Sequence, residues 1–128
     1  MPHVVLSATE EASIRAVLAS VAYLLDGREY DRLGEVFSDD VHFENPGRLV
    51  ADGLSTLITA MKGIAEPALS HHITNVIVNP QPDGSAVCLS KALTLRKSGV
   101  WNAAEYRDVV RHGADGWRIS SRTIKPIG

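Results

Sequence analysis

The spacing of apolar residues changes near residue 69, and this change constrains the fold more than any other feature of the sequence. Before that point apolar residues recur every three or four positions, which is typical of helices that bury one face. After it they alternate with polar residues, which is typical of strands. Helices followed by strands predict an α+β fold, in which helices cover one face of a meandering antiparallel sheet.

The first predicted helix begins at Glu10 and has Thr9 as its N-cap, since a Thr hydroxyl can accept a hydrogen bond from the helix N-terminus. Gly27 provides the stop signal at its other end. The apolar face repeats at i, i+3, i+4 and i+7, and it consists of Ile14, Val17, Leu18, Val21 and Leu25. This stripe predicts a helix that packs against the sheet along most of its length.

Two shorter helices and one short strand complete the N-terminal prediction. The second helix is expected over residues 29–37, before a turn at residues 38–40. A short strand at residues 41–44 leads into a tight turn at residues 45–47, because Pro fixes φ and Gly tolerates either sign of it. Asp52 is expected to cap the third helix, which must end before the next proline.

The second half of the chain contains breaks that are typical of hairpins, and they separate four long strands near residues 69–79, 85–97, 100–112 and 117–125. One face of the second long strand has small side chains: Ala86, Cys88, Ser90, Ala92 and Thr94. A face of this kind can pack flat against another sheet. The sequence therefore predicts a homodimer that forms through it.

Composition limits the kinds of partner. The 128 residues are 45% hydrophobic, which suffices for one core, so a single domain over residues 1–128 is expected. Thirteen basic and fifteen acidic residues, without a long basic run, argue against a nucleic-acid partner. No apolar stretch is long enough to span a membrane, and residues 1–7 do not resemble a signal peptide. We therefore expect a cytoplasmic protein.

The sequence favours neither a metal nor another cofactor. Cys88 is the only cysteine, so it cannot form an intrachain disulfide, and we expect a buried thiol. Among the five histidines, His3 lies near the N-terminus, and His42 and His112 fall on different predicted strands. No histidine pair has the spacing of metal ligands beside a carboxylate.

Five short strings occur in a recognisable order: Tyr-Leu-Leu-Asp-Gly-Arg-Glu-Tyr-Asp-Arg-Leu at 23–33, Phe-Ser-Asp-Asp at 37–40, His-His-Ile-Thr-Asn at 71–75, Glu-Tyr-Arg-Asp at 105–108 and Asp-Gly-Trp-Arg-Ile at 115–119. Their order and spacing resemble the SnoaL-like branch of the nuclear transport factor two superfamily. The resemblance implies a conical fold, with three N-terminal helices packed on a curved, mostly antiparallel sheet of four long strands plus a short one, around a deep pocket. This superfamily includes polyketide cyclases, scytalone dehydratase and ketosteroid isomerase, and also proteins that only bind or assemble.

Asp26 and His71 are the first candidates for chemistry. Asp26 lies at the border of the apolar helix face, where it either faces the pocket or bonds the backbone of the following turn. His71 shares a strand face with Asn75, and His72 points to the other side unless a bulge exchanges the faces. The family's His-x-x-x-Asn spacing selects His71, and by resemblance to scytalone dehydratase Asp26 aligns with an aspartate of its catalytic network. An imidazole can accept and donate a proton near pH 7.

Tyr106 and Asp108 alternate onto one face of the third long strand, and the family pattern favours this face for the pocket. They would supply a phenol donor and a carboxylate there. Alternatively, Tyr106 is a core ring and Asp108 an ion-pair partner of Arg122 or Arg118. Asn45 falls where ketosteroid isomerases carry a catalytic aspartate. Because an amide does not take up a proton at neutral pH, Asn45 could bind a substrate carbonyl or simply form the turn.

These residues lead to the hypothesis of a cofactor-free cyclase, dehydratase or isomerase that acts on a hydrophobic carbonyl compound such as a polyketide intermediate. Asp26 and His71 would be the acid/base pair, with Tyr106 and Asp108 as further catalytic residues. The expected substrate-binding residues are Asn45, His72, Asn75, Val21, Leu25, Phe43, Leu57 and Met61. The alternative is a non-catalytic binding or assembly domain, in which the acid/base pair is too far apart to share a proton.

Overall fold

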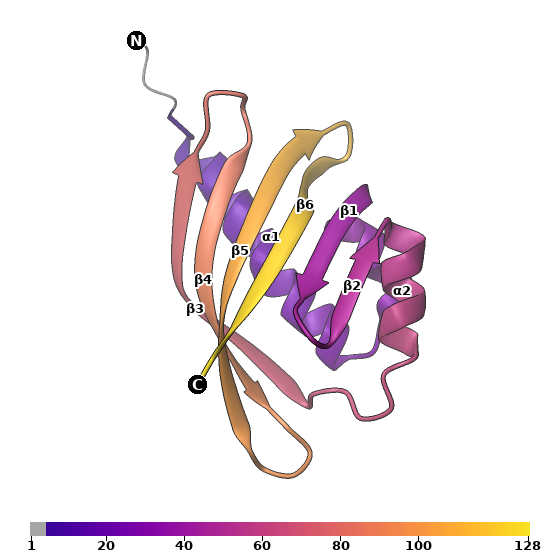
Figure 1. Ribbon diagram of the computed structural model, residues 1–128. Coiled ribbons are helices and arrows are strands. Elements are labelled where there is room, and N and C mark those ends of the chain that lie inside the picture. Colours follow the sequence, from indigo (N-terminus) through magenta and orange to yellow (C-terminus); the bar gives the residue numbers. More distant parts are fainter. Residues whose placement is uncertain (1–4) are drawn as a thin grey trace.

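A six-stranded sheet forms the framework of the structure. In chain order its strands are β1 (Phe37–Asn45), β2 (Leu49–Asp52), β3 (Ser70–Pro80), β4 (Ala86–Leu95), β5 (Trp101–Gly113) and β6 (Gly116–Ile127). They lie in the order β2-β1-β6-β5-β4-β3, and all neighbours are antiparallel except β1 and β6 (Figure 1). The computed structural model describes residues 5–128, and residues 1–4, which include His3, lie outside the described part.

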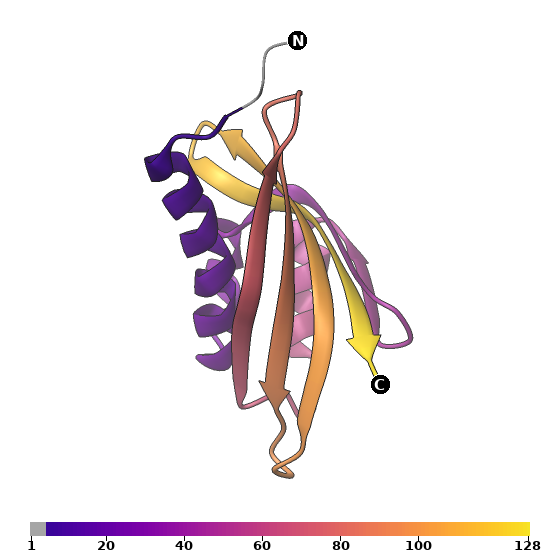
Figure 2. The ribbon, with the colours of Figure 1, turned by 90° about the vertical axis from the view of Figure 1, so that its left-hand side faces the viewer.

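The helices lie on one side of this sheet. The long helix α1 (Ala8–Asp26) runs beside the strands, and the sheet twists and curves along its length (Figure 2). The shorter α2 (Leu54–Lys62) lies next to the hairpin of β1 and β2 (Figure 1). Between α1 and β1 the chain forms a 3-10 helix, η1 (Tyr30–Glu35). The predicted α+β class is therefore confirmed, but one long helix and two short ones replace the three expected helices.

The apolar face of α1 packs as predicted. Ile14, Leu18 and Val21 are at most 1% exposed, and Val17 and Leu25 are partly buried against the same core. The helix contacts β3 and β6, which belong to different parts of the sheet. This packing holds the C-terminal end of α1 beside the start of β3.

The ends of the helices differ from the prediction. Ser7, not Thr9, caps α1, because the Ser7 hydroxyl accepts a hydrogen bond from the N–H of Glu10 and the Glu10 carboxylate accepts one from the N–H of Ser7, both at 3.1 Å. Asp52 does not cap α2. It is the last residue of β2, and Gly53, whose φ of 90° disfavours other residues, precedes the helix.

The predicted helix over residues 29–37 and the turn after it are wrong in part. The 3-10 helix ends at Glu35, and residues 38–40 belong to β1. Phe37 starts this strand beside Ile119 of β6, and both side chains are buried. The boundary between η1 and β1 depends on parallel pairing with β6, about eighty residues away in the sequence. The local sequence pattern cannot predict such pairing.

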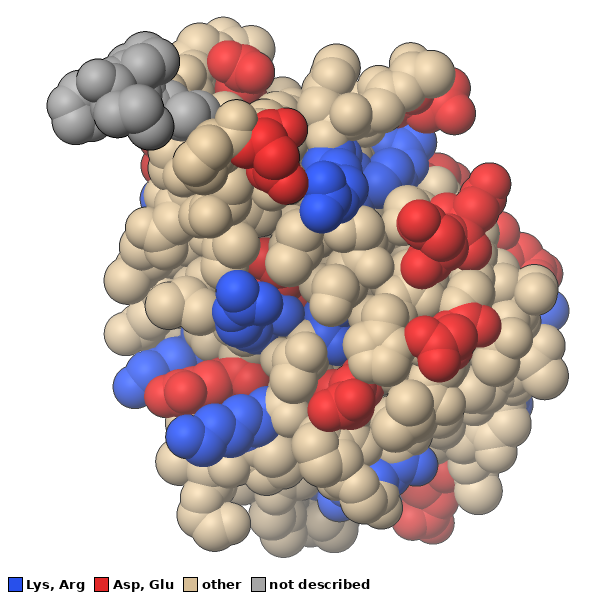
Figure 3. Space-filling view, turned by 45° about the horizontal axis from the view of Figure 1, so that its top comes forward, with Lys and Arg blue, Asp and Glu red and all other residues tan. Residues whose placement is uncertain are grey.

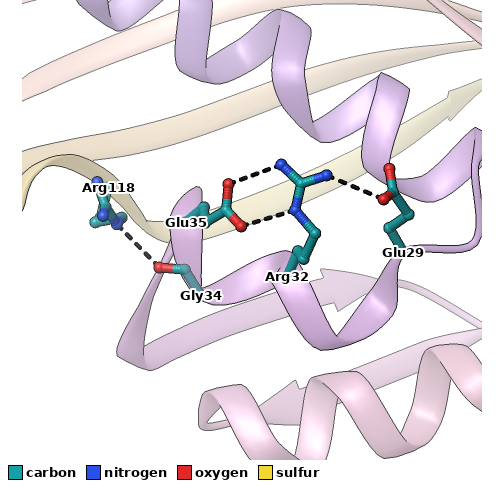
Figure 4. Close-up of polar contacts among 5 residues, drawn as sticks. All are labelled: Glu29, Arg32, Gly34, Glu35 and Arg118. Carbon is teal, nitrogen blue, oxygen red and sulfur yellow. Dashed lines mark hydrogen bonds and ion pairs between the residues drawn. The ribbon is translucent and has the colours of Figure 1, made fainter.

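Polar contacts hold η1 in place (Figure 4). The Arg32 guanidinium donates to the carboxylates of Glu35, at 2.8 and 3.1 Å, and Glu29, at 3.0 Å. Arg118 of β6 donates to the carbonyl oxygen of Gly34 at 3.0 Å. These contacts join the connection after α1 to the sheet.

The sheet has one strand more than predicted, and a different face is buried in β4. The extra strand is β2, whose four residues are too few for a clear alternation. In β4 the small side chains of Ala86, Cys88 and Ala92 are buried, whereas Leu89 and Leu93 are exposed. The small side chains of Ala86, Cys88 and Ala92 belong to the hydrophobic core, which larger side chains of other elements fill. The predicted homodimer therefore cannot form through the small face.

Charged side chains of both signs are interspersed on the face shown in Figure 3, without a continuous area of one sign. Among residues 5–128, no helix combines the length and the apolar character that a membrane span requires.

Replacing Leu18 by Ala tests how much the α1 packing contributes to stability. Because Leu18 is only 1% exposed, we expect the free energy of unfolding to fall by about 2–5 kcal/mol, measured by urea denaturation. Tyr23 lies on the same helix and is 79% exposed, so Tyr23→Ala is the control. This variant should change the free energy of unfolding by less than about 0.5 kcal/mol. Equal losses in both variants would contradict this packing.

Candidate active site

A cavity of about 580 Å³ lies between the helices and the inner face of the sheet. This volume is in the range of small-molecule sites. Much of its wall is apolar and includes Leu25, Phe43, Met61, Ala104 and Ile124. The polar wall residues come from separate elements and include Asn45, His71, Tyr106 and Arg122.

Asp26 and His71 form a hydrogen-bonded pair at this wall. The Asp26 carboxylate accepts a hydrogen bond from the backbone N–H of His71, with its oxygens at 3.1 and 3.0 Å, and Oδ1 lies 2.6 Å from Nδ1 of the His71 ring. The two side chains are 24% and 17% exposed. Asp26 thus holds both the backbone and the ring of His71. The other ring nitrogen, Nε2, makes no hydrogen bond to the described part of the chain.

The end of α1 explains why Asp26 can reach β3. Asp26 is the last helical residue, and after Gly27 the chain turns sharply at Arg28, which has a positive φ of 55°. The carboxylate therefore projects from the helix end, where β3 begins one residue before His71. The predicted alternative, a carboxylate bonded only to its own turn, does not describe this geometry.

A second ionic pair lies deeper in the structure. Asp108 of β5 and Arg122 of β6 are cross-strand partners and are 0% and 2% exposed. Arg122 donates from Nε at 2.6 Å and from Nη2 at 3.1 Å, so the contact is bidentate. Burial by itself would lower the pKa of Arg122, but the charge and hydrogen bonds of Asp108 outweigh it and raise this pKa. The third nitrogen, Nη1, has no hydrogen-bond partner within residues 5–128.

Tyr106 lies against this pair. Its ring centroid is 4.5 Å from the Arg122 guanidinium carbon, and the residue is 7% exposed. Burial raises the pKa of Tyr106; the charge of Arg122 opposes this rise and that of Asp108 adds to it. The phenol therefore remains protonated at neutral pH and can donate a hydrogen bond into the cavity that it lines.

Asn45 contributes a polar group with an open hydrogen-bonding position. Its Oδ1 atom is buried and lacks a partner among the described residues. Asn45 is the last residue of β1, and its carbonyl oxygen accepts a hydrogen bond from the N–H of Arg48 at 3.0 Å, which closes the predicted turn. An unpaired buried amide oxygen in a cavity wall can accept a hydrogen bond from a bound molecule.

The family model for the SnoaL-like domain matches residues 7–123. The chain belongs to the SnoaL-like domain family. Its match covers both ionic pairs and nearly all of the cavity wall. The predicted membership of this family, which has a cystatin-like α+β fold, is confirmed.

Solved structures show the same fold. A protein of Novosphingobium aromaticivorans, provisionally assigned as a scytalone dehydratase, is 20% identical with a TM-score of 0.81, covering 94% of this chain and 85% of its own. ActVI-ORFA from Streptomyces coelicolor is 21% identical with a TM-score of 0.75, and the match covers 91% of this chain and 96% of ActVI-ORFA. An NTF2-like protein with a cystatin-like fold, also from N. aromaticivorans, is 19% identical with a TM-score of 0.80, and the match covers 93% of this chain and 82% of that protein. No curated protein sequence matches the chain.

Several residues that the sequence suggests for the SnoaL-like pocket lie elsewhere. His72 is exposed, and its ring packs 5.5 Å from the Trp101 ring, on the side of the sheet away from the cavity. Asn75 is also exposed and has a φ of 55°, at a bulge where the pairing of β3 with β4 shifts between Thr74 and Ile77. The bulge turns Asn75 away from the face of His71, so their predicted common orientation is wrong.

Four other predicted residues lie behind the wall rather than in it. Val21 and Leu57 are fully buried core residues that do not line the cavity. Asp26 and Asp108 are set back behind His71 and Arg122, the residues they contact. Of the predicted polar residues, Asn45, His71 and Tyr106 line the cavity directly.

Sequence reasoning missed the arginines of the wall. The sequence suggests Arg122 only as an ion-pair partner of Asp108 and does not suggest Arg48 or Arg96 as pocket residues, although all three line the cavity. The available signal was weak: Arg48 and Arg96 lie in or beside hairpin turns, where arginine is usually a solvent-exposed residue. Within residues 5–128, no three His, Cys, Asp or Glu side chains are grouped closely enough to hold a metal ion.

Removing one member of the buried pair tests its importance for the fold. Asp108→Asn leaves the Arg122 charge uncompensated, so the free energy of unfolding should fall by about 3–5 kcal/mol. The double variant Asp108→Leu/Arg122→Met removes both charges and should recover much of this loss. Asp31→Asn, in the exposed pair with Lys62, is the control, with an expected change below about 1 kcal/mol. A double variant no more stable than Asp108→Asn would contradict this account.

Proposed function

We propose that this SnoaL-like protein catalyses proton transfer next to a carbonyl group of an apolar small molecule, as a cyclase, dehydratase or isomerase whose own side chains serve as acid and base. The observation behind this proposal is the hydrogen-bonded pair of Asp26 and His71 at the wall of a mostly apolar cavity. A histidine held by a carboxylate through one ring nitrogen is available as a general base through the other.

In this proposal, Nδ1–H of His71 donates to Asp26, and Nε2 removes a proton from the carbon next to the substrate carbonyl. The electron pair of the broken C–H bond forms a C=C bond, and the π pair of the carbonyl group moves onto its oxygen, which gives an enolate. Asp26 stabilises the imidazolium that results. His71 then returns the proton to a different carbon for isomerisation, to a departing hydroxyl for dehydration, or to the product oxygen after ring closure for cyclisation.

Arg122 and Tyr106 are the proposed donors to the enolate oxygen. Both line the cavity, and Nη1 of Arg122 and the Tyr106 phenol are free to donate. Hydrogen-bond donors that are fixed before the reaction stabilise developing negative charge strongly in a site with little water. Asp108 is then a positioning residue, because it holds the Arg122 guanidinium by two hydrogen bonds. Asn45 would accept a hydrogen bond from a substrate hydroxyl.

The alternative role, a domain that only binds or assembles, requires Asp26 and His71 to be too far apart to share a proton. The 2.6 Å separation between Oδ1 of Asp26 and Nδ1 of His71 supports the catalytic role instead.

We further propose that residues 1–128 act as one domain.

Hydrogen exchange tests the proposed proton transfer without knowledge of the natural substrate. In D2O, the protein should accelerate exchange of the α-protons of 2-tetralone, followed by NMR, above the buffer rate. His71→Ala should lower the enzymatic rate by about 10²–10⁴-fold. Asp26→Asn should also lower it, because the neutral amide no longer stabilises the imidazolium and its NH2 group can hold the His71 ring in the wrong tautomer. His72→Ala, at the neighbouring position on the other face, should leave it unchanged.

If no member of a series of linear and cyclic aromatic ketones exchanges faster than in buffer, the binding role becomes the better interpretation. Equal loss in His71→Ala and His72→Ala would also count against the assignment.

We propose that the predicted homodimer uses the outer face of the sheet, where large apolar side chains are exposed on neighbouring strands: Ile77, Leu89, Leu93 and Trp101. Sedimentation equilibrium should show a dimer, and Leu89→Lys/Leu93→Lys should produce a monomer. Val50→Lys, at an exposed apolar position on β2, should leave the dimer intact. A monomeric wild-type protein at high concentration would remove this proposal.

A further inference from the structure

The charged side chains that line the cavity all have the same sign. Arg48, Arg96 and Arg122 belong to the wall, and within residues 5–128 no aspartate or glutamate side chain is part of it. The chain as a whole has a formal charge of −2. The positive side chains around the cavity therefore run against the net charge of the protein, and they do not reflect a generally basic surface.

Two of the three arginines lack an internal counter-charge. Arg122 is neutralised by Asp108. Within the described part of the chain, Arg48 and Arg96 pair with no carboxylate. Arg96 donates instead to the backbone carbonyl of Glu66 at 3.1 Å, which holds its guanidinium beside the segment after α2.

The backbone fixes both arginines at one end of the sheet. The N–H of Arg48 donates to the carbonyl of Asn45 at 3.0 Å in the turn between β1 and β2. That of Arg96 donates to Val100 at 2.8 Å in the turn between β4 and β5. These two turns lie at the same end of the sheet (Figure 1).

We propose that the cavity selects an anionic substrate, an apolar carbonyl compound that carries a carboxylate, and that Arg48 and Arg96 bind this carboxylate at the mouth. Guanidinium groups match the planar geometry of carboxylates, and neither arginine is paired with a carboxylate of residues 5–128. The proposal rests on the proposed function in one respect, since the carbonyl of the same compound would reach His71.

Binding of two matched probes tests this selectivity without any turnover. By calorimetry at pH 7.5, 2-naphthoate should bind about tenfold more tightly than the neutral 2-naphthamide, because two partly exposed charge-assisted contacts have roughly this strength. Arg48→Gln/Arg96→Gln should remove the preference and leave the amide affinity unchanged. Lys97→Gln/Lys125→Gln makes the same charge change on exposed positions outside the cavity, so it should keep the preference.

The experiment also separates this proposal from the catalytic one. His71→Ala should lose proton exchange but keep the preference for 2-naphthoate, and titration of the wild-type protein with 2-naphthoate should shift the NMR signals of the His71 ring. Equal affinities for the two probes, a preference that survives Arg48→Gln/Arg96→Gln, or an unmoved His71 signal would each overturn the proposal. None of these results would change the exchange test of Asp26 and His71.

Discussion

The contact between Asp26 and His71 joins the two halves of the molecule at the cavity. One carboxylate accepts hydrogen bonds from the backbone and the ring of a residue forty-five positions away, so the end of α1 and the start of β3 are held together. The same contact orients the ring so that Nε2 makes no hydrogen bond to residues 5–128. The geometry of this contact depends on the packing of Ile14, Leu18 and Val21 in the core. This packing fixes the position of the C-terminal end of α1 relative to the sheet.

The buried pair of Asp108 and Arg122 plays a corresponding part inside the sheet. Two charges in a nearly water-free interior are costly unless each satisfies the other, and here the pair is bidentate. The pair leaves one guanidinium nitrogen for a ligand and places Tyr106 against the cation. The polar groups of the cavity are therefore supported from behind by two carboxylates that lie outside its wall. The side chains that the described residues contribute to the wall are positive or neutral.

Local patterns predicted much of this arrangement. The alternation in β5 placed Tyr106 and Asp108 on one face, and both are buried. The same reasoning failed for Asn75, because the bulge in β3 turns that residue out of register, and a bulge leaves no trace in a hydrophobic pattern. It failed for the dimer face of β4 because small residues there face inward. These small residues pack in the core with larger side chains from other elements, and a single strand does not show which of its faces will do so.

The sequence by itself determined the order of the helices and of the four long strands, the apolar face of α1, the turn at residues 45–47 and the family. These features depend on periodicity, on turn residues and on short strings, all of which are local. Tertiary structure decided which residues meet: the contact of Asp26 with His71, the choice of Arg122 over Arg118 as partner of Asp108, and the arginines around the cavity. Such contacts join residues from distant segments, and their geometry depends on register, curvature and packing, which no single segment contains.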